Sequence, residues 1–388
     1  MEAIANKFIT HVNNSAQATI FIAFCALGAA KGVVIRMRKI VQVGVILALL
    51  CLVGGITAGC GQKAPEKVSG QPQTDGKYEL RFVGTLPVQH HCSQAQDYFK
   101  KLVEEKSNGK VQIQVYPAGQ LYTDKDLVDV VPRGGVDLAY INSGMWTGLV
   151  PELAFMEFLT LYKDADHWWR VNAEDTEVRK LYADALEKKA NTKFLGWLAY
   201  GSYSELISKK PVKTMTDFKG MRIRAVTEYH NYFLHGIGAT SSTISSAEVY
   251  QGLQRGVLDG VMTGPTSMVT RKLYESAKYV TRFNFHDVGF MIVASLDCWK
   301  KLPKDVQNII LEAVQETEKW CREESKKVNE KDWKTLEQMS DVKIYPFPQE
   351  ELKKLRDAGL PPQIEKYKER IGDARLVDHL LAVVEKLR

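Results

Sequence analysis

The stretch "VQIQVYPAGQLYTDKDLVDVVPRGGVDLAYINS", residues 111–143, indicates the fold class of this chain. Its first part, residues 111–119, alternates apolar and polar side chains, as a strand with one buried face does. Residues 121–135 are typical of a short helix, and residues 136–143 are typical of another strand. A strand, a helix and a further strand in this order predict a parallel α/β sheet with right-handed crossovers.

The same rhythm continues on both sides of this stretch. A strand at 78–85 and a helix at 93–110 precede it. Further along the chain the pattern starts again, with strands at 192–200, 220–226 and 257–264 and helices at 227–238 and 246–256. Two α/β units in one chain predict two lobes around a cleft. Ligands of open α/β sheets bind beyond the carboxyl ends of the strands, so we expect a binding site in that cleft.

The last third of the chain changes character. Residues 303–339 are helix-forming throughout, with apolar residues near the helical period and charged residues between them. One helix of about 30 residues would be about 45 Å long and could lie across both lobes. Two ordinary helices fit the same pattern, and the pattern alone favours neither.

The N-terminal region predicts export and a lipid anchor. In "MRKIVQVGVILALLCLVGGITAGC", residues 37–60, a basic start is followed by an apolar run and small residues before Cys60. This is a secretory signal, and its end resembles the lipobox of bacterial lipoproteins. A transmembrane anchor is the alternative, but the run is interrupted by Gln42 and by glycines, and about 17 residues is short for a span. We expect Met37 to be the initiator; a longer leader that includes residues 1–36 is the competing interpretation.

Processing at Cys60 would change the composition of the chain. Residues 1–59 hold five of the 52 basic and one of the 46 acidic side chains, which leaves 47 basic and 45 acidic ones and a net charge of +2. Such a balance gives little reason to expect nucleic-acid binding. The remaining 329 residues suit two domains. Residues 60–77 hold the lipidated cysteine and a polar segment rich in Gly, Pro and Gln, which predicts a flexible tether.

Three cysteines remain after processing. Cys92, Cys298 and Cys321 have no local spacing pattern, so they predict neither a disulfide framework nor a zinc site. At most one bridge can form among them. We expect no metal and no cofactor.

Five stretches of the chain, in order and spacing, resemble the DctP-type extracytoplasmic solute receptors of tripartite ATP-independent periplasmic (TRAP) transporters. They are "FKKLVEEKSNGKVQIQVYPAGQL", "GGVDLAY", "DFKGMRIRAV", "SAEVYQGLQRGVLDGVMTGP" and "KKLPKDVQNIILEAVQET". The resemblance covers roughly residues 78–345. It implies a two-lobe periplasmic-binding-protein-like α/β fold with a long helix spanning both lobes, and partners that are integral membrane subunits driven by an ion gradient. By the same resemblance, lobe I comprises 78–201 plus 290–329, and lobe II comprises 202–289 plus 330–388.

Two arginines share one face of the strand in "DFKGMRIRAVTEYH", residues 217–230. The resemblance places Arg224 at the family's ligand-binding arginine, which holds a carboxylate. The residues agree, since Arg224 is closer to the strand's exit than Arg222, and a guanidinium matches the two oxygens of a carboxylate. We expect Arg222 to pair with a nearby acid. A permanent internal salt bridge for Arg224 is the alternative.

One departure from the family bears on the ligand. Many relatives carry another arginine shortly after the preceding strand, and here that position falls on Tyr203 or Ser204. Either residue offers a hydroxyl in place of a fixed charge. This indicates a monocarboxylate, with an apolar or hydroxylated tail.

Other candidates for the binding site come from strand ends. His91, in "LPVQHHCS", lies where relatives often place a polar ligand contact; a metal is the other interpretation, but adjacent side chains point apart. Tyr140 and Asn142 lie at the exit of their strand. Trp146 follows shortly after and is either a ligand contact or ordinary packing.

Two further candidates are small. Thr263 and Gly264, in "VMTGP", match the place where relatives use an amide or aromatic side chain. Their size leaves room for a bulkier ligand.

Two other classes of protein compete with a transport receptor. An enzyme is one, but the sequence has no G-x-S-x-G elbow, phosphate-binding loop, H-E-x-x-H motif or dinucleotide fingerprint, so we expect no catalysis. The other is a ligand-binding lobe that reports to a sensor. The residues alone do not separate that class from transport.

Overall fold

The computed structural model describes residues 76–202, 205–283 and 287–388. The predicted signal, the lipid site at Cys60, the tether and the candidates Tyr203 and Ser204 therefore lie outside the described residues. Within those ranges, no helix combines the length and the apolar character needed to cross a bilayer.

The first of two sheets contains the strands predicted at 78–85, 111–119, 136–143 and 192–200, together with a strand that was not predicted. It has five strands in the order β2-β1-β3-β10-β4: β1 (Tyr78–Val83), β2 (Val111–Tyr116), β3 (Leu138–Asn142), β4 (Thr192–Ser202) and β10 (Asp287–Ser295). β1 lies between β2 and β3 and is parallel to both, which confirms the predicted parallel pairing. β10 is antiparallel to its two neighbours, β3 and β4.

Helices on this sheet begin where the chain offers side-chain caps. α4 (His91–Lys106) begins after His90, whose ring accepts the backbone N–H of Cys92. α5 (Asp124–Val130) begins with a capping box formed by Thr123 and Asp126. The other elements of this part are η2 (Ser143–Trp146), η3 (Pro151–Glu157), α6 (Ala165–Val171), α7 (Glu177–Ala190) and α11 (Leu296–Lys301).

The second sheet has six shorter strands in the order β11-β9-β5-β8-β6-β7. They are β5 (Glu205–Ser208), β6 (Arg222–Ala225), β7 (Thr240–Thr243), β8 (Gly260–Thr263), β9 (Tyr279–Arg282) and β11 (Lys343–Pro346). β6 is parallel to both β7 and β8. The helical segments of this part are η4 (Met215–Phe218), α8 (Glu228–Gly236), α9 (Val249–Gln254), α10 (Pro265–Thr270) and η5 (Leu273–Glu275).

Each sheet is packed by its own apolar cores. One large core surrounds the first sheet, and two smaller cores lie against the second. The chain therefore forms a two-lobe α/β fold. Near the C-terminus, α13 (Gln349–Ile371) packs on α8 of the second lobe, whereas α14 (Ala374–Lys386) places Val377, Leu380 and Val384 in the first core. The family resemblance implies instead that all of residues 330–388 lie with the second lobe.

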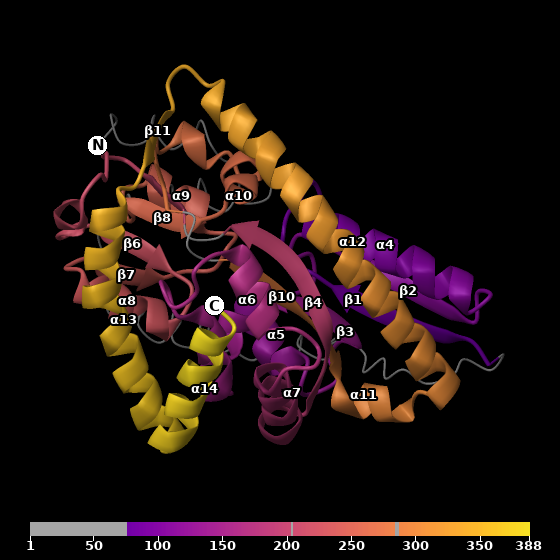
Figure 1. Ribbon diagram of the computed structural model, residues 1–388. Coiled ribbons are helices and arrows are strands. Elements are labelled where there is room, and N and C mark those ends of the chain that lie inside the picture. Colours follow the sequence, from indigo (N-terminus) through magenta and orange to yellow (C-terminus); the bar gives the residue numbers. More distant parts are fainter. Residues whose placement is uncertain (1–75, 203–204, 284–286) are drawn as a thin grey trace, which may run out of the picture. The chain divides into compact units, whose positions relative to one another are not determined.

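One helix connects the two lobes. α12 (Lys304–Glu337) is a single helix of 34 residues, so the one-helix alternative is confirmed (Figure 1). It contacts α4 and β4 of the first lobe and α10 of the second. It packs tightly at the end of β4, because a Cβ on Gly201, whose φ is +93°, would lie 2.0 Å from Nδ2 of Asn329. On the other side, Thr266 of α10 donates a hydrogen bond of 3.3 Å to Oδ1 of Asn329.

Candidate ligand-binding cleft

A cavity lies where the strand ends of the two sheets face each other. The cavity has a volume of about 30 Å³, within about 400 Å³ of space that includes its opening to solvent. Its walls therefore lie close together. The first lobe lines it with Leu86, Asn142, Tyr200 and Phe290, and the second lobe with Arg224, Val226, Ser246, Val249, Val261, Thr263, Ser267, Arg271 and Leu273.

Arg224 enters this cavity from β6. Its side chain is buried, with 5% of the residue exposed. Nε and Nη2 donate hydrogen bonds of 3.4 and 3.3 Å to the carbonyl oxygen of Ile244, and Nη2 donates a third, of 3.3 Å, to Oγ of Ser246. Ser246 in turn donates a hydrogen bond of 2.7 Å to Oδ2 of Asp124, which belongs to the first lobe. The guanidinium is thus oriented by the second lobe and linked to the first through one hydroxyl.

Arg222, two residues earlier on β6, has a different environment. Its Nε and Nη2 bind the two carboxylate oxygens of Asp259 at 3.0 and 2.8 Å, as the sequence analysis expects of a pair with a nearby acid. This pair is exposed at the surface and does not line the cavity. Two arginines with one residue between them on β6 therefore have different roles: Arg222 forms a surface salt bridge, and Arg224 places a cation in the cleft.

A second cation in the cavity comes from the end of α10. Arg271 follows this helix directly and lines the same cavity as Arg224. Its Nη2 atom is buried and has no hydrogen-bond partner within the described ranges. Burial, with a smaller contribution from Arg224, lowers the pKa of Arg271 from its ordinary value, while Tyr200 and Asp124 act in the opposite direction. Two guanidinium groups thus share a space from which water is largely excluded.

Polar groups of the first lobe complete the cavity. Oδ1 of Asn142 accepts the backbone N–H of Gly144 at 2.8 Å, so its Nδ2 is the atom that can donate to a ligand. The hydroxyl of Tyr200 lies 2.9 Å from Oγ1 of Thr263 and donates a 2.7 Å hydrogen bond to Oγ of Ser267. Both of these partners belong to the second lobe. The Tyr200 hydroxyl therefore joins the two walls of the cleft.

Aromatic rings stack on one side of this cavity. The ring of Tyr200 stacks on Phe290 at 5.4 Å between centroids and on His90 at 5.0 Å, and His90 lies against His91 at 4.4 Å. Burial is the main cause that lowers the pKa of His90 well below its ordinary value, and the charges of His91 and Arg271 add to it. Burial likewise lowers the pKa of His91 to about 4. Both rings are therefore neutral at ordinary pH.

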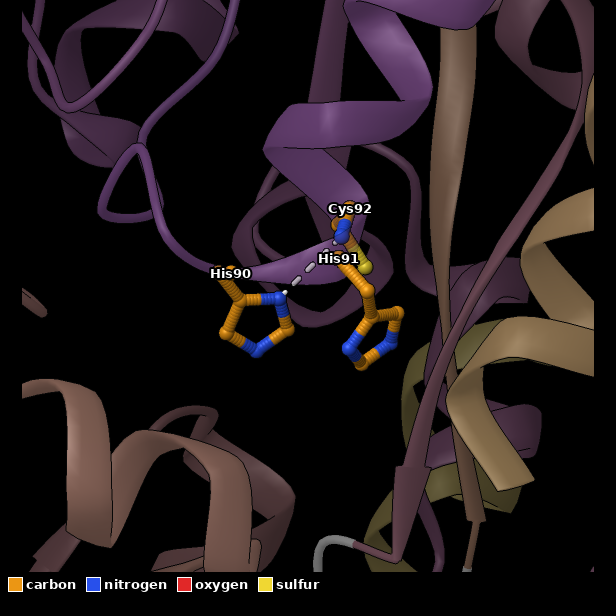
Figure 2. A group of neighbouring side chains, drawn as sticks. All are labelled: His90, His91 and Cys92. Atoms are coloured by element: carbon orange, nitrogen blue, oxygen red, sulfur yellow. Dashed lines mark hydrogen bonds between the residues drawn. The ribbon is translucent and has the colours of Figure 1, made fainter. Parts of the chain in front are cut away.

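His90, His91 and Cys92 are close enough together to be considered as metal ligands. One potential ligand atom from each lies within 4.8 Å of the others (Figure 2). Nδ1 of His90 already accepts the amide of Cys92 at 3.2 Å, and Nε2 of His91 lies 2.8 Å from the carbonyl oxygen of Ala199. Both ring contacts are therefore to groups of the protein itself, and burial accounts for both low pKa values. The absence of a metal site stays a prediction.

Some of the residues predicted for the site line the cavity, and others do not. Arg224, Asn142 and Thr263 line the cavity, whereas His91, Tyr140, Trp146 and Gly264 are outside its lining. The Tyr140 hydroxyl accepts the amide of Leu86 at 3.2 Å and lies 2.8 Å from Oγ of Ser93, and burial raises its pKa. Trp146 is fully buried in the first core, and Gly264 precedes the first residue of α10. Cys92, Cys298 and Cys321 are buried, and none of them forms a disulfide within the described residues.

Five polar or aromatic residues of the cavity were missed by sequence reasoning: Tyr200, Ser246, Ser267, Arg271 and Phe290. Tyr200 had a usable signal, since it ends a predicted strand just as Asn142 does. Arg271 had none, because its place at the cavity depends on how α10 packs between the second sheet and α12.

Two lobes, a connecting helix and a cation-lined cavity between strand ends define an extracytoplasmic solute-binding protein. The sequence profile of "Bacterial extracellular solute-binding protein, family 7", the DctP family, matches residues 82–370. The chain belongs to this family and is a solute-binding protein of the TRAP transporter type.

Relatives and solved structures extend the comparison. The chain is 26% identical over 276 residues to the C4-dicarboxylate-binding periplasmic protein DctP of Rhodobacter capsulatus, covering 71% of this chain and 81% of that protein. A TRAP periplasmic solute-binding protein from Roseobacter denitrificans with bound β-D-glucuronate has a TM-score of 0.73 at 25% identity, covering 78% and 98% of the two chains. Another, from Sulfurospirillum deleyianum with bound succinate, has a TM-score of 0.71 at 25% identity, covering 80% and 99%.

Proposed function

We propose that this protein captures a small organic carboxylate by closing its lobes and delivers it to the membrane subunits of a TRAP transporter. The observation that carries the proposal is the buried guanidinium of Arg224 in a cavity built by both lobes. A guanidinium binds a carboxylate through two parallel N–H donors, and this pairing is stronger where water is excluded. The bound glucuronate and succinate of the two similar structures are both carboxylates.

Closure would work through hydrogen bonds between the lobes. Tyr200 bonds Thr263 and Ser267 across the cleft, and Asp124 accepts from Ser246. A ligand that enters between separated lobes brings its carboxylate to Arg224, and these contacts form as the lobes approach. The ligand's own groups replace water in the cavity, so binding and closure favour each other.

Further parts of the proposal concern the chain outside the cleft. The protein performs no catalysis, and its lobes are divided as expected from the sequence except that all of β10 and α14 belong with the first lobe. It works outside the cytoplasm, as its family does, and is held at the membrane by a lipid on Cys60 after removal of the signal. Mass spectrometry of the protein isolated from membranes tests the anchor: we expect an N-terminal peptide that begins with an acylated Cys60. An unmodified peptide that spans residue 60 would contradict it.

The ligand proposal is tested by thermal unfolding in the presence of organic acids. A ligand at about 1,000 times its dissociation constant stabilises the folded state by about 4 kcal/mol, which raises the unfolding midpoint by several degrees. Arg224→Met removes the anchor and should weaken binding about 10- to 100-fold. Arg222→Met is the matched control, because it makes the same change on the same strand face outside the cavity, and it should leave binding unchanged.

Two results would contradict the proposal. A shift that survives Arg224→Met would place the carboxylate elsewhere on the protein. No shift with any organic acid would remove the carboxylate ligand from the proposal altogether.

A further inference from the structure

We propose that Arg271 is a second ligand-binding residue and that the ligand carries two anionic groups, one for each of the guanidinium groups of Arg224 and Arg271. The inference rests on the proposed function and specifies the class of ligand that the cleft selects.

The first support is the environment of Arg271. Its side chain reaches the cavity from the C-terminal end of α10, and buried Nη2 has no hydrogen-bond partner in the part of the chain that the structure describes. No ion pair joins it to an acid within the same residues. A buried donor on a charged group without a partner destabilises the protein. A ligand atom at this point would supply the missing acceptor.

The second support is the charge inside the cavity. Arg224 lies close enough to Arg271 to lower its pKa, so the two cations repel each other in a poorly solvated space. Asp124 is the acid whose charge opposes this effect, and both of its oxygens are already engaged, by Ser246 at 2.7 Å and by the amide of Lys125 at 3.1 Å. One carboxylate at Arg224 would neutralise one cation and leave the other.

The positive charge of Arg271 favours a diacid over a hydroxylated monoacid as the ligand. A ligand hydroxyl can accept from Nη2 of Arg271, but it does not compensate the positive charge. A second anionic group does both. Nδ2 of Asn142 can donate to a hydroxyl group along the ligand. The absence of an arginine at positions 203 and 204, which indicated a monocarboxylate, is therefore offset by a cation from a different element.

Calorimetry with matched pairs of acids tests this assignment. The probes are succinate against butyrate and galactarate against galactonate, pairs that differ in whether the second end of the chain is a carboxylate. We expect the wild-type protein to bind at least one diacid about 10- to 100-fold more tightly than its monoacid partner. Arg271→Gln should remove this preference, weakening the diacid about 10- to 100-fold and changing the monoacid less than about threefold.

Arg255→Gln is the matched control. It removes a guanidinium from an exposed position at the end of α9 in the same lobe, and it should leave both affinities unchanged. Unfolding midpoints of all variants show whether each one is folded.

The proposal is overturned if the wild-type protein prefers the monoacid in each pair, or if folded Arg271→Gln weakens both members equally. If acids bind and Arg224→Met abolishes that binding while Arg271→Gln keeps the diacid preference, the proposed function stands and only this inference fails. If no acid of either kind binds, both fail.

Discussion

The position of an arginine along one strand decides what it binds. Arg222 and Arg224 share a face of β6, yet the first forms a bidentate pair with Asp259 at the surface and the second lines the cavity. Exposed pairs of this kind contribute little to stability, typically about 0 to 1 kcal/mol. The cation in the cavity is more consequential, because its charge is poorly solvated and a ligand can compensate it.

Tyr200 is the residue whose hydroxyl can be tested alone. Tyr200→Phe removes the hydrogen bonds to Thr263 and Ser267 across the cleft and keeps the ring stacked on Phe290. Each such bond contributes about 0.5 to 1.5 kcal/mol, so we expect affinity for the bound acid to fall about 5- to 100-fold, mainly through faster dissociation. Stopped-flow measurement of ligand release checks this.

Tyr162→Phe provides the comparison for that variant. Its hydroxyl donates to the carbonyl oxygen of Phe155 at 3.2 Å, entirely within the first lobe. It should lower the unfolding midpoint and leave ligand release unchanged. Equal release rates for wild type and Tyr200→Phe would show that the cross-cleft bonds do not hold the lobes together.

A buried acid lies where η3 of the first lobe meets α8 of the second. Nε2 of His230 lies 3.0 Å from the backbone oxygen of Glu157 and 3.7 Å from its Oε2, while Ser143 donates to Oε1. Burial raises the pKa of Glu157 to about 7, although the bond from Ser143 opposes the shift. Burial, and to a lesser extent the charge of Arg224, lowers the pKa of His230 to about 4. Both side chains are therefore largely neutral near pH 6.

This contact predicts a stability that falls as the pH rises. The raised pKa means that the folded protein holds a proton on Glu157 that the unfolded chain releases. The stabilisation of the folded state by this proton is therefore complete below about pH 4.5 and is lost as the pH rises to about 7. A shift of this size corresponds to roughly 3 kcal/mol. Glu157→Gln should lack this pH dependence. Its free energy of unfolding, relative to that of wild type, should therefore be higher at pH 8 than at pH 5.

Unfolding midpoints of both proteins between pH 5 and 8 measure the difference. Glu228→Gln, at the exposed N-terminus of α8, is the control and should follow the wild-type curve. Parallel curves for wild type and Glu157→Gln would contradict the raised pKa. The pH dependence due to His230 has the opposite sign. The stabilisation of the folded state by its neutral ring is present above about pH 6.5 and is lost as the pH falls toward 4.

The alternation of strands and helices was enough to predict two α/β lobes, because backbone pairing and the burial of one face leave a local pattern. A strand end also indicated Asn142, whereas the family resemblance indicated Thr263 and, in agreement with the strand end, Arg224. The pattern did not give Arg271 or Ser246, which reach the cavity from a helix end and a loop. It also did not give the packing of α14 on the first core. These depend on contacts between segments far apart in the chain, which a local pattern does not record.

The helix α12 limits how the lobes can move. It contacts β4 and α4 at one lobe and α10 at the other, so the lobes cannot separate fully without breaking one of these contacts. Closure is therefore expected as a rotation about the connecting segments rather than a sliding of one lobe past the other.

The place of β10 has a consequence for how the chain acquires its structure as it is synthesised. β10 lies between β3 and β4, and in the sequence it follows β5 through β9 of the second lobe. A chain that emerges N-terminus first therefore cannot complete its first sheet until most of the second lobe has also emerged. We expect a fragment of residues 76–283 to lack the cooperative unfolding transition of the full chain in circular dichroism; a cooperative transition in that fragment would contradict this. The first lobe therefore stays incomplete until β10 has emerged, and it is exposed to proteases and chaperones for the same interval.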